Sequence, residues 1–422
     1  MKKINIIYLS LILVFSFNFF NAKAQEAKPD TLLKAIEQLQ SDVSLLKNLK
    51  ISGYFQFQGQ FADSSGIASY AGGNFPAHTD KRFGVRRGRI KFAYSSNPLS
   101  QYVVQFDITE AGLKTKDVYA KFTDPFVNWF SVTGGVFNRP WGYEIEYSSS
   151  NRESPERTRF NQTVFKDERD LGAMLTIQAP KTSRFNFIKL DAGLFTGNAI
   201  NPDFDQFKDF IGRVNFTKSF LNETLKISGD ASYYWGGFAN QTTTLMKVQD
   251  INGVKSFQPK TVDLYSRAVK ELVGFDFQVC YDAPFGLSTI RYEYAKGRQA
   301  SLKDDATSVM TLPSANAYIR DVMGYYIYFV QNIGQSRHSI VVKYDVFDPN
   351  TKVSDKEISA ANGFSKADVK YSTLGLGYAC RLDANMKLVI YRDIVKNEET
   401  SISKYTKDLK DNVWTIRLQY KF

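Results

Sequence analysis

The sequence predicts an all-β protein, a 16-stranded antiparallel transmembrane β-barrel with a short N-terminal periplasmic coiled-coil helix. Three observations lead to this fold class. From Leu49 onward, apolar and polar residues alternate with a period of two in sixteen segments. Long connections mostly follow the odd-numbered segments, and short connections follow the even-numbered ones. The chain begins like an exported protein, and no later stretch approaches the ~20 apolar residues of a membrane helix.

Residues 1–24 are expected to be a cleaved signal peptide. Lys2 and Lys3 precede an apolar run, and Ala22-Lys23-Ala24 supplies small residues at the two positions that a signal peptidase needs. The alternative is an uncleaved membrane anchor. Cleavage would remove three lysines and lower the formal net charge from +11 to +8.

Residues 25–50 are expected to form a periplasmic helix. Its apolar residues recur at spacings of four and three, the pattern of a heptad seam; they are Leu32, Ile36, Leu39, Val43 and Leu46. The β-branched residues at one seam position, with leucine at the other, favour two strands in an isolated coiled coil. So short a helix is marginal alone and needs partners. The alternative is a single amphipathic helix on a surface.

Sixteen strands are expected between Leu49 and the C-terminus. They run near residues 49–61, 84–95, 100–109, 115–122, 129–138, 169–179, 185–196, 208–218, 224–235, 269–282, 286–297, 320–333, 336–346, 368–381, 386–396 and 411–422. The last strand must pair with the first, because closure removes the sheet edges that lipid cannot hydrate. In that strand Leu418 is expected to face lipid, and Arg417 is expected to face water in the lumen.

The lengths of the connections predict the orientation of the barrel. The long ones span about 62–83, 139–168, 236–268, 298–319 and 347–367. The short ones include SNPL and APFG. Bacterial outer-membrane barrels have short periplasmic turns and long external loops. Residues 51–422 are therefore expected to form a barrel that contacts outer-membrane lipid in a Gram-negative bacterium.

Several segments carry a family resemblance: KISGYFQFQGQ (50–60), FGVRRGRIKF (83–92), KDVYAKF (116–122), GVFNRPWGYEIEYSSSNRESPER (135–157), DERDLGAML (167–175), DFDQFKDFIGRV (203–214), GYYIYFVQNI (324–333) and KYDVFDPN (343–350). The chain resembles the phosphate-selective porin O and P family in its Bacteroidetes-type form. The resemblance implies a homotrimer of water-filled pores and a third external loop, about 139–168, that folds inward. The terminal Phe422 also resembles the signal that such proteins present to the barrel-assembly machinery.

Nine basic residues are candidates for lining the pore and contacting anions. Arg87, Arg89 and Lys91 share the polar face of the second strand, about 6–7 Å apart between neighbours. Arg86 is expected on the other face. The resemblance adds the third loop, whose basic residues are Arg139, Arg152, Arg157, Arg159, Lys166 and Arg169.

Acidic residues should limit the anion preference. Residues 138–170 contain seven acidic side chains against six basic ones, whereas a phosphate filter needs uncompensated positive charge. Asp107 and Asp117 could also neutralise the basic residues of the second strand. We expect passive diffusion of small anionic or neutral solutes, with a mild preference for anions, phosphate among them, and no tight phosphate site.

Other functional classes find little support in the sequence. His78 and His338 are the only histidines and are far apart in the chain, so neither a metal site nor a Ser-His catalytic pair is indicated. We expect no enzymatic activity, no cofactor and no nucleic-acid partner, since no basic-aromatic reading module is present. Cys280 and Cys380 could form a disulfide or remain free thiols. The alternative function is a structural or adhesive outer-membrane barrel with a closed lumen.

Overall fold

The structure is a computed structural model that describes residues 33–39, 43 and 47–422. The chain divides into two units, Met1–Leu49 and Lys50–Phe422. In the first unit, residues 33–39, 43 and 47 are helical and exposed. The predicted signal peptide, and the remainder of the helix predicted for 25–50, lie outside the described residues. No helix in the described ranges is long and apolar enough to cross a membrane.

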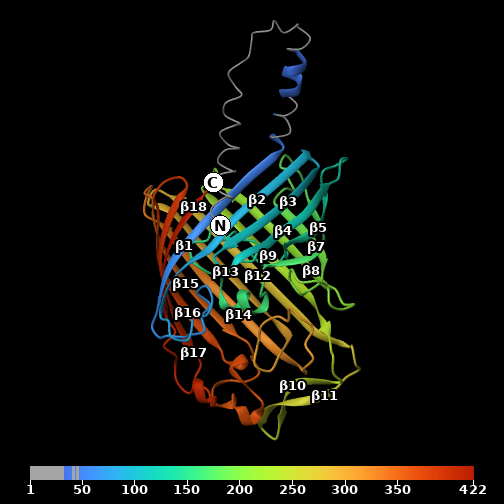
Figure 1. Ribbon diagram of the computed structural model, residues 1–422, viewed down its shortest axis with the longest axis vertical. Helices are drawn as coiled ribbons and strands as arrows, with labels where there is room; N and C mark the ends of the chain where they lie inside the picture. The colour runs from blue at the N-terminus through green and yellow to red at the C-terminus, as the bar shows by residue number, and fades with distance from the viewer. Residues whose placement is uncertain (1–32, 40–42, 44–46) are drawn as a thin grey trace, which may run out of the picture. The chain divides into compact units, whose positions relative to one another are not determined.

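The second unit is a closed antiparallel barrel of sixteen strands, as predicted (Figure 1). The strands of the ring are β1 (Leu49–Ala62), β2 (Lys81–Asn97), β3 (Ser100–Thr109), β4 (Gly112–Thr123), β5 (Phe130–Asn138), β6 (Arg169–Gln178), β7 (Ile188–Phe195), β8 (Asp209–Phe220), β9 (Leu225–Ala239), β12 (Arg267–Ala283), β13 (Gly286–Ser301), β14 (Ala317–Asn332), β15 (His338–Asp348), β16 (Tyr371–Arg381), β17 (Met386–Asn397) and β18 (Val413–Lys421). Each strand pairs with its neighbour in the ring, and β9 pairs directly with β12.

The closing strand has the predicted inside and outside faces. β18 pairs with β1 from Tyr54↔Lys421 to Ala62↔Val413, which closes the ring. Ile416 and Leu418 are exposed on the outer face, whereas the alternate residue Thr415 is completely buried. A closed barrel with an apolar outer face satisfies its backbone internally and is suited to lipid. The fold therefore places the protein in the outer membrane of a Gram-negative bacterium.

Connections of different length lie at opposite ends of the strands. The short ones are 98–99, 124–129, 179–187, 221–224, 284–285, 333–337 and 382–385. The long ones are 63–80, 139–168, 196–208, 240–266, 302–316, 349–370 and 398–412. Residues 110–111, between β3 and β4, form the single short connection at the long-loop end. Most predicted strand bounds differ from the observed ones by one to four residues. For example, β7 starts at Ile188 and not at residue 185, because turn hydrogen bonds such as Asn186 Nδ2 to Ala179 O (2.7 Å) hold the preceding residues out of the ladder.

The connection after β9 contains a hairpin that the sequence-based prediction treated as loop. Its strands are β10 (Thr244–Ile251) and β11 (Val254–Thr261). Asn252 and Gly253 join them with φ angles of 55° and 81°, a left-handed pair that suits a tight hairpin turn. β10 also pairs in parallel with the start of β14, so the hairpin extends the barrel wall at the long-loop end (Figure 1).

Candidate functional site

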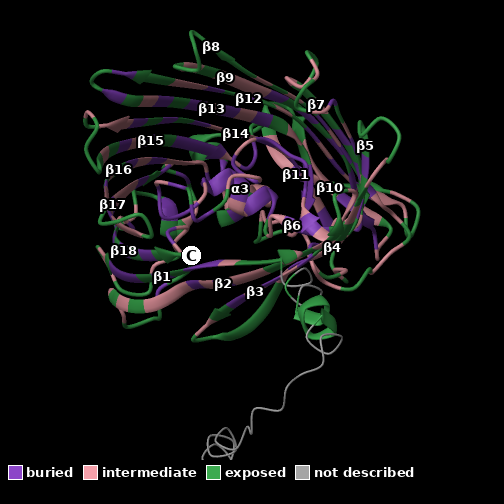
Figure 2. Ribbon diagram, turned by 90° about the horizontal axis from the view of Figure 1, so that it is seen from above, coloured by how far each residue is buried: buried purple, intermediate pink, exposed green. Residues whose placement is uncertain are grey.

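The third connection at the long-loop end, residues 139–168, lies inside the barrel and contains the short helix α3 (Arg159–Val164), seen within the ring of strands in Figure 2. Glu144 of the same loop organises the start of this helix. Its carboxylate accepts hydrogen bonds from the Thr158 hydroxyl (2.8 Å) and from the Asn161 amide side chain (2.8 Å). A carboxylate is favourable beside the free N–H groups of a helix start.

Apolar contacts attach the loop to one side of the barrel wall. Trp141, Ile145, Phe160, Val164 and Phe165 of the loop belong to a buried cluster with Phe195, Ile211, Tyr234 and Leu272 of the strands. Gly324 in β14 makes room for this contact, because a Cβ there would lie 2.4 Å from the Phe160 ring. The loop is therefore packed like part of a protein core.

Polar contacts attach the same loop to the opposite side, near the closing strands. The Ser149 hydroxyl lies 2.5 Å from the Tyr54 hydroxyl of β1. The Ser150 carbonyl accepts hydrogen bonds from Gln419 of β18 (2.9 Å) and Lys387 of β17 (3.2 Å). Because it is bound at both sides, the loop crosses the lumen and divides it.

Glu156 of the loop is the centre of a basic cluster. Its carboxylate forms ion pairs with Arg86 (2.9 Å) and Arg87 (2.9 Å) of β2 and with Arg417 (2.8 Å) of β18. Burial alone would raise the pKa of Glu156, but the three guanidinium groups outweigh burial and hold the pKa well below its usual range. One carboxylate thus faces three positive charges, and the cluster keeps an excess of positive charge.

Arg152 lies beside this cluster without a partner. The residue is only 3% exposed, and among the described residues none of its guanidinium nitrogens has a hydrogen-bond partner. Burial, followed by the charge of Arg157, lowers the pKa of Arg152 to about 10. The side chain is still protonated at neutral pH and adds a fourth positive charge to the surroundings of Glu156.

A second network of ion pairs joins the loop to β2, β3, β4 and β6. Its members are Arg89, Lys116, Arg157 and Arg169 with Asp107, Asp117, Asp167 and Glu168. Arg89 lies 3.2 Å from Asp107 and 3.5 Å from Glu168. The network contains four basic and four acidic groups, so its charges balance.

The remaining candidate residues of the loop region serve other contacts. Arg139 forms a buried 2.9 Å ion pair with Asp170 at the base of the loop. Arg159 stacks over the Tyr371 ring, 3.6 Å from its centroid. Lys166 is exposed. These three residues are not gathered around Glu156.

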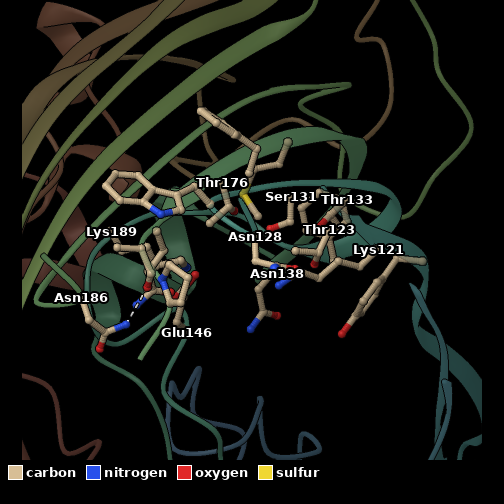
Figure 3. A pocket seen from close by; sticks show the side chains of 18 of the residues that line it. Lys121, Thr123, Asn128, Ser131, Thr133, Asn138, Glu146, Thr176, Asn186 and Lys189 are labelled. Carbon is tan, nitrogen blue, oxygen red and sulfur yellow. Dashed lines mark hydrogen bonds between the residues drawn. The ribbon is translucent and has the colours of Figure 1, made fainter. Parts of the chain in front are cut away.

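Two hollows lie on either side of the second network. The one at the short-turn end has a volume of about 520 Å³ and is lined by Lys91, Asp117 and Lys121, the last of which is labelled in Figure 3. The other, at the long-loop end, has a volume of about 300 Å³ and is lined by Arg86 and Asp107. Because Asp107 and Asp117 both belong to the network, the ion pairs separate the two hollows.

The prediction for Arg86 was wrong. It was expected on the outer face, yet it binds Glu156 together with its neighbour Arg87. Arg82 also points inward and donates to Gln60 (2.9 Å). The inward side chains of β2 therefore change from even to odd numbers after Arg86, the effect that a β-bulge has on alternation. Strict period two could not reveal this change.

Arg417 faces the lumen as predicted, but it is in contact with the loop and not with open water. The residue is only 3% exposed, because the loop covers it. Its guanidinium group donates a hydrogen bond to the carbonyl of Pro155 (2.6 Å). The alternation of β18 indicated the correct face. The partners could not be found from the sequence, because Glu156 is far from β18 along the chain.

Solved structures resemble this barrel, although no protein-family model and no curated protein matched the sequence. The anion-selective porin from Comamonas acidovorans matches at 9% identity with a TM-score of 0.52, over 89% of this chain and 99% of that one. The channel DcaP of Acinetobacter baumannii matches at 9% identity and a TM-score of 0.52, over 89% and 97%. The trimer form of Vibrio cholerae OmpT matches at 10% identity and a TM-score of 0.50, over 89% and 99%. The chain therefore has the fold of the outer-membrane porins.

Proposed function

We propose that the protein is a passive diffusion channel for small hydrophilic solutes, with a mild preference for anions. The observation that carries this proposal is the basic cluster in the lumen. Three arginines share the single carboxylate of Glu156, and Arg152 adds a further charge. Positive charge that is not fully neutralised attracts anions and repels cations.

The preference should be mild because the neighbouring network is balanced. Arg89 has two acidic partners, Asp107 and Glu168, so much of its field is cancelled locally. The guanidinium groups of Arg87 and Arg417 are already bound to protein oxygens. Phosphate remains one candidate solute, without a preformed tight site, and the phosphate-selective porin O and P family remains the proposed relationship.

Planar-bilayer recording under a salt gradient tests this proposal. The wild-type protein should give steady ohmic steps, and its reversal potential should indicate chloride over potassium. Replacing Arg87 and Arg89 with glutamine should move the reversal potential toward zero or past it. As a control, Lys404→Gln with Lys407→Gln removes the same charge from exposed positions of an external loop and should leave the potential unchanged. An unchanged potential in the Arg87/Arg89 variant would contradict the proposal.

A structural or adhesive barrel with a closed lumen is the second candidate. It is favoured by the ion pairs that lie between the two hollows, since they bridge the loop and four strands. This function predicts correct insertion without current. Silent but fully inserted protein in the bilayer experiment would support it over the channel.

We also propose that the mature protein is a homotrimer. The proposed order of the chain is a cleaved signal peptide at 1–24, a periplasmic helix at 25–50 and the barrel at 51–422, inserted by the barrel-assembly machinery. The trimer rests on the family resemblance and on the fold shared with a barrel described in a trimer form. Native mass measurement in mild detergent should give three copies. A stable dimer would mean that the heptad helix governs assembly.

A further inference from the structure

A groove runs over the outside of β12, β13 and β14 near the long-loop end. Its volume is about 530 Å³, and Val273, Tyr294 and Met323 line it together with Lys296 and Arg298. The outward side chains form two rows across the strands. Glu271, Arg298 and Asp321 pair in one row, and Val273, Lys296 and Met323 pair in the next. Charged side chains thus border an apolar floor.

The groove lies at the external boundary of the apolar belt. At about 3.3 Å per residue and a tilt of about 40°, β13 rises about 23 Å from the exposed Leu287 to Lys296. Such barrels have an apolar band of about 25 Å with aromatic residues at its borders. Tyr294 forms a row with Phe275 and Tyr325 one step below Lys296. Lys296 is therefore level with lipid headgroups.

Basic side chains converge above this boundary. Lys247 and Lys260 come from the β10–β11 hairpin, which joins β14. Burial, and then the charges of Lys260, Arg298 and Lys352, lower the pKa of Lys247 from its ordinary value. A set of basic groups that repel one another in this way is short of counter-charge.

Glu271 and Asp321, which also line the groove, neutralise only part of this charge. Asp321 pairs with Lys352 at 3.0 Å, and Glu271 pairs with Arg298. The five basic side chains are Lys247, Lys260, Lys296, Arg298 and Lys352, against Glu271 and Asp321, which leaves +3. Within the described residues, no ion pair involves the exposed Lys296.

We propose that this groove binds the phosphorylated headgroup of a glycolipid in the outer leaflet. The phosphate would lie between Lys296 and Arg298 of the groove and Lys352, which pairs with the groove residue Asp321. An acyl chain would follow the apolar floor past Val273 and Met323. The charge of the cluster is complementary to a phosphate, and its height matches the headgroups. A basic cluster beside apolar surface at that height is a recognised means of holding an anionic lipid.

Native mass spectrometry of the full protein in mild detergent tests the proposal with lipid A carrying two, one or no phosphates. Binding should weaken at least about tenfold from the bisphosphorylated to the dephosphorylated lipid. Lys296→Gln with Lys352→Gln should weaken binding of the bisphosphorylated lipid at least about tenfold, since each basic residue near an anionic membrane contributes roughly fivefold. The exposed pair Lys404→Gln with Lys407→Gln is the matched control and should bind like wild type.

Several results would overturn the proposal. Equal binding of the three lipids by the wild-type protein would overturn it, and this result does not depend on how any variant folds. Unchanged binding by the Lys296/Lys352 variant would exclude these residues. Displacement of lipid A by millimolar inorganic phosphate would assign a site for free anions, and a change in subunit number in the variant would assign the groove to a contact between copies.

Discussion

At the scale of single residues, Glu156 links the loop to the barrel wall and also sets the charge of the lumen. Its three arginine partners come from β2 and β18, which are neighbours of β1 on either side. The period of β2 predicted that Arg87 and Arg89 point inward, and the structure places both there. The same pattern could not identify Glu156 as their partner, because it depends on where a long loop folds.

Replacing Glu156 with glutamine should strengthen the preference for anions. The change removes one negative charge and releases three guanidinium groups. At about 10 Å in water, one unit charge changes the energy of a passing ion by about 0.4 kcal/mol, so the chloride-to-potassium permeability ratio should rise about fourfold. Reversal potentials measure this ratio. The loop should keep its place, because the apolar cluster around Trp141 does not involve Glu156.

The control for this variant is Glu357→Gln, which removes the same charge from an exposed residue that pairs with Lys255 on an external loop. It should leave the permeability ratio unchanged. A ratio that falls or stays constant in the Glu156 variant would mean that permeating ions do not sense this cluster.

Substitutions on the outer face of the closing strand test the depth at which its residues lie in the membrane. Leu418 is exposed on the lipid side of β18. Leu418→Arg should destabilise the folded barrel by about 2–4 kcal/mol if the residue lies at mid-membrane. Tyr420→Arg, on the same face but nearer the short-turn end, should cost about 0–1 kcal/mol. Reversible unfolding in denaturant and lipid measures both. Equal costs would contradict the assigned depth.

At the scale of elements, strands could be predicted better than the structure inside the lumen. Strand β3 was predicted with its observed bounds, because a half-buried strand displays its two faces in the order of its residues. The β10–β11 hairpin was missed although Asn252-Gly253 is a strong hairpin signal. Helix α3 was missed for another reason: it is too short for a helical period and depends on Glu144 and the barrel wall.

A substitution at Gly324 in β14 tests whether α3 is fixed to the barrel wall. Gly324→Ala would place a Cβ 2.4 Å from the Phe160 ring. Overpacking of this kind typically costs about 1–3 kcal/mol, and relief requires the helix to move away from β14. We expect altered single-channel conductance and noisier current. Gly134→Ala, where a Cβ meets nothing within 4 Å, is the control and should behave like wild type. Identical traces for both variants would show that the helix does not shape the pathway.

At the scale of the whole molecule, the alternation of residues predicted the ring, and the family resemblance implied the inward loop, but neither predicted the contacts that the loop makes. Closure follows from alternation and from the cost of an unpaired edge in lipid. The contacts that form the candidate site join residues distant in sequence, such as Arg417 with Glu156. No period along one strand reports such a pair. Charge counting over residues 138–170 gave a slight acidic excess, whereas the wall arginines make the surroundings of Glu156 basic.

The orientation of the barrel gives the last prediction. Asn97 lies at the end of β2, next to the short connection 98–99, and Asn252 lies at the tip of the long connection after β9. Because long loops face outward in such barrels, a cysteine at Asn252 should react with a membrane-impermeant maleimide on intact cells. A cysteine at Asn97 should react only after the outer membrane is permeabilised.

The free native Cys280 and Cys380 are first replaced by serine, so that each labelled site is unique. Efficient labelling of Asn97→Cys on intact cells, with Asn252→Cys protected, would require the barrel to be inverted.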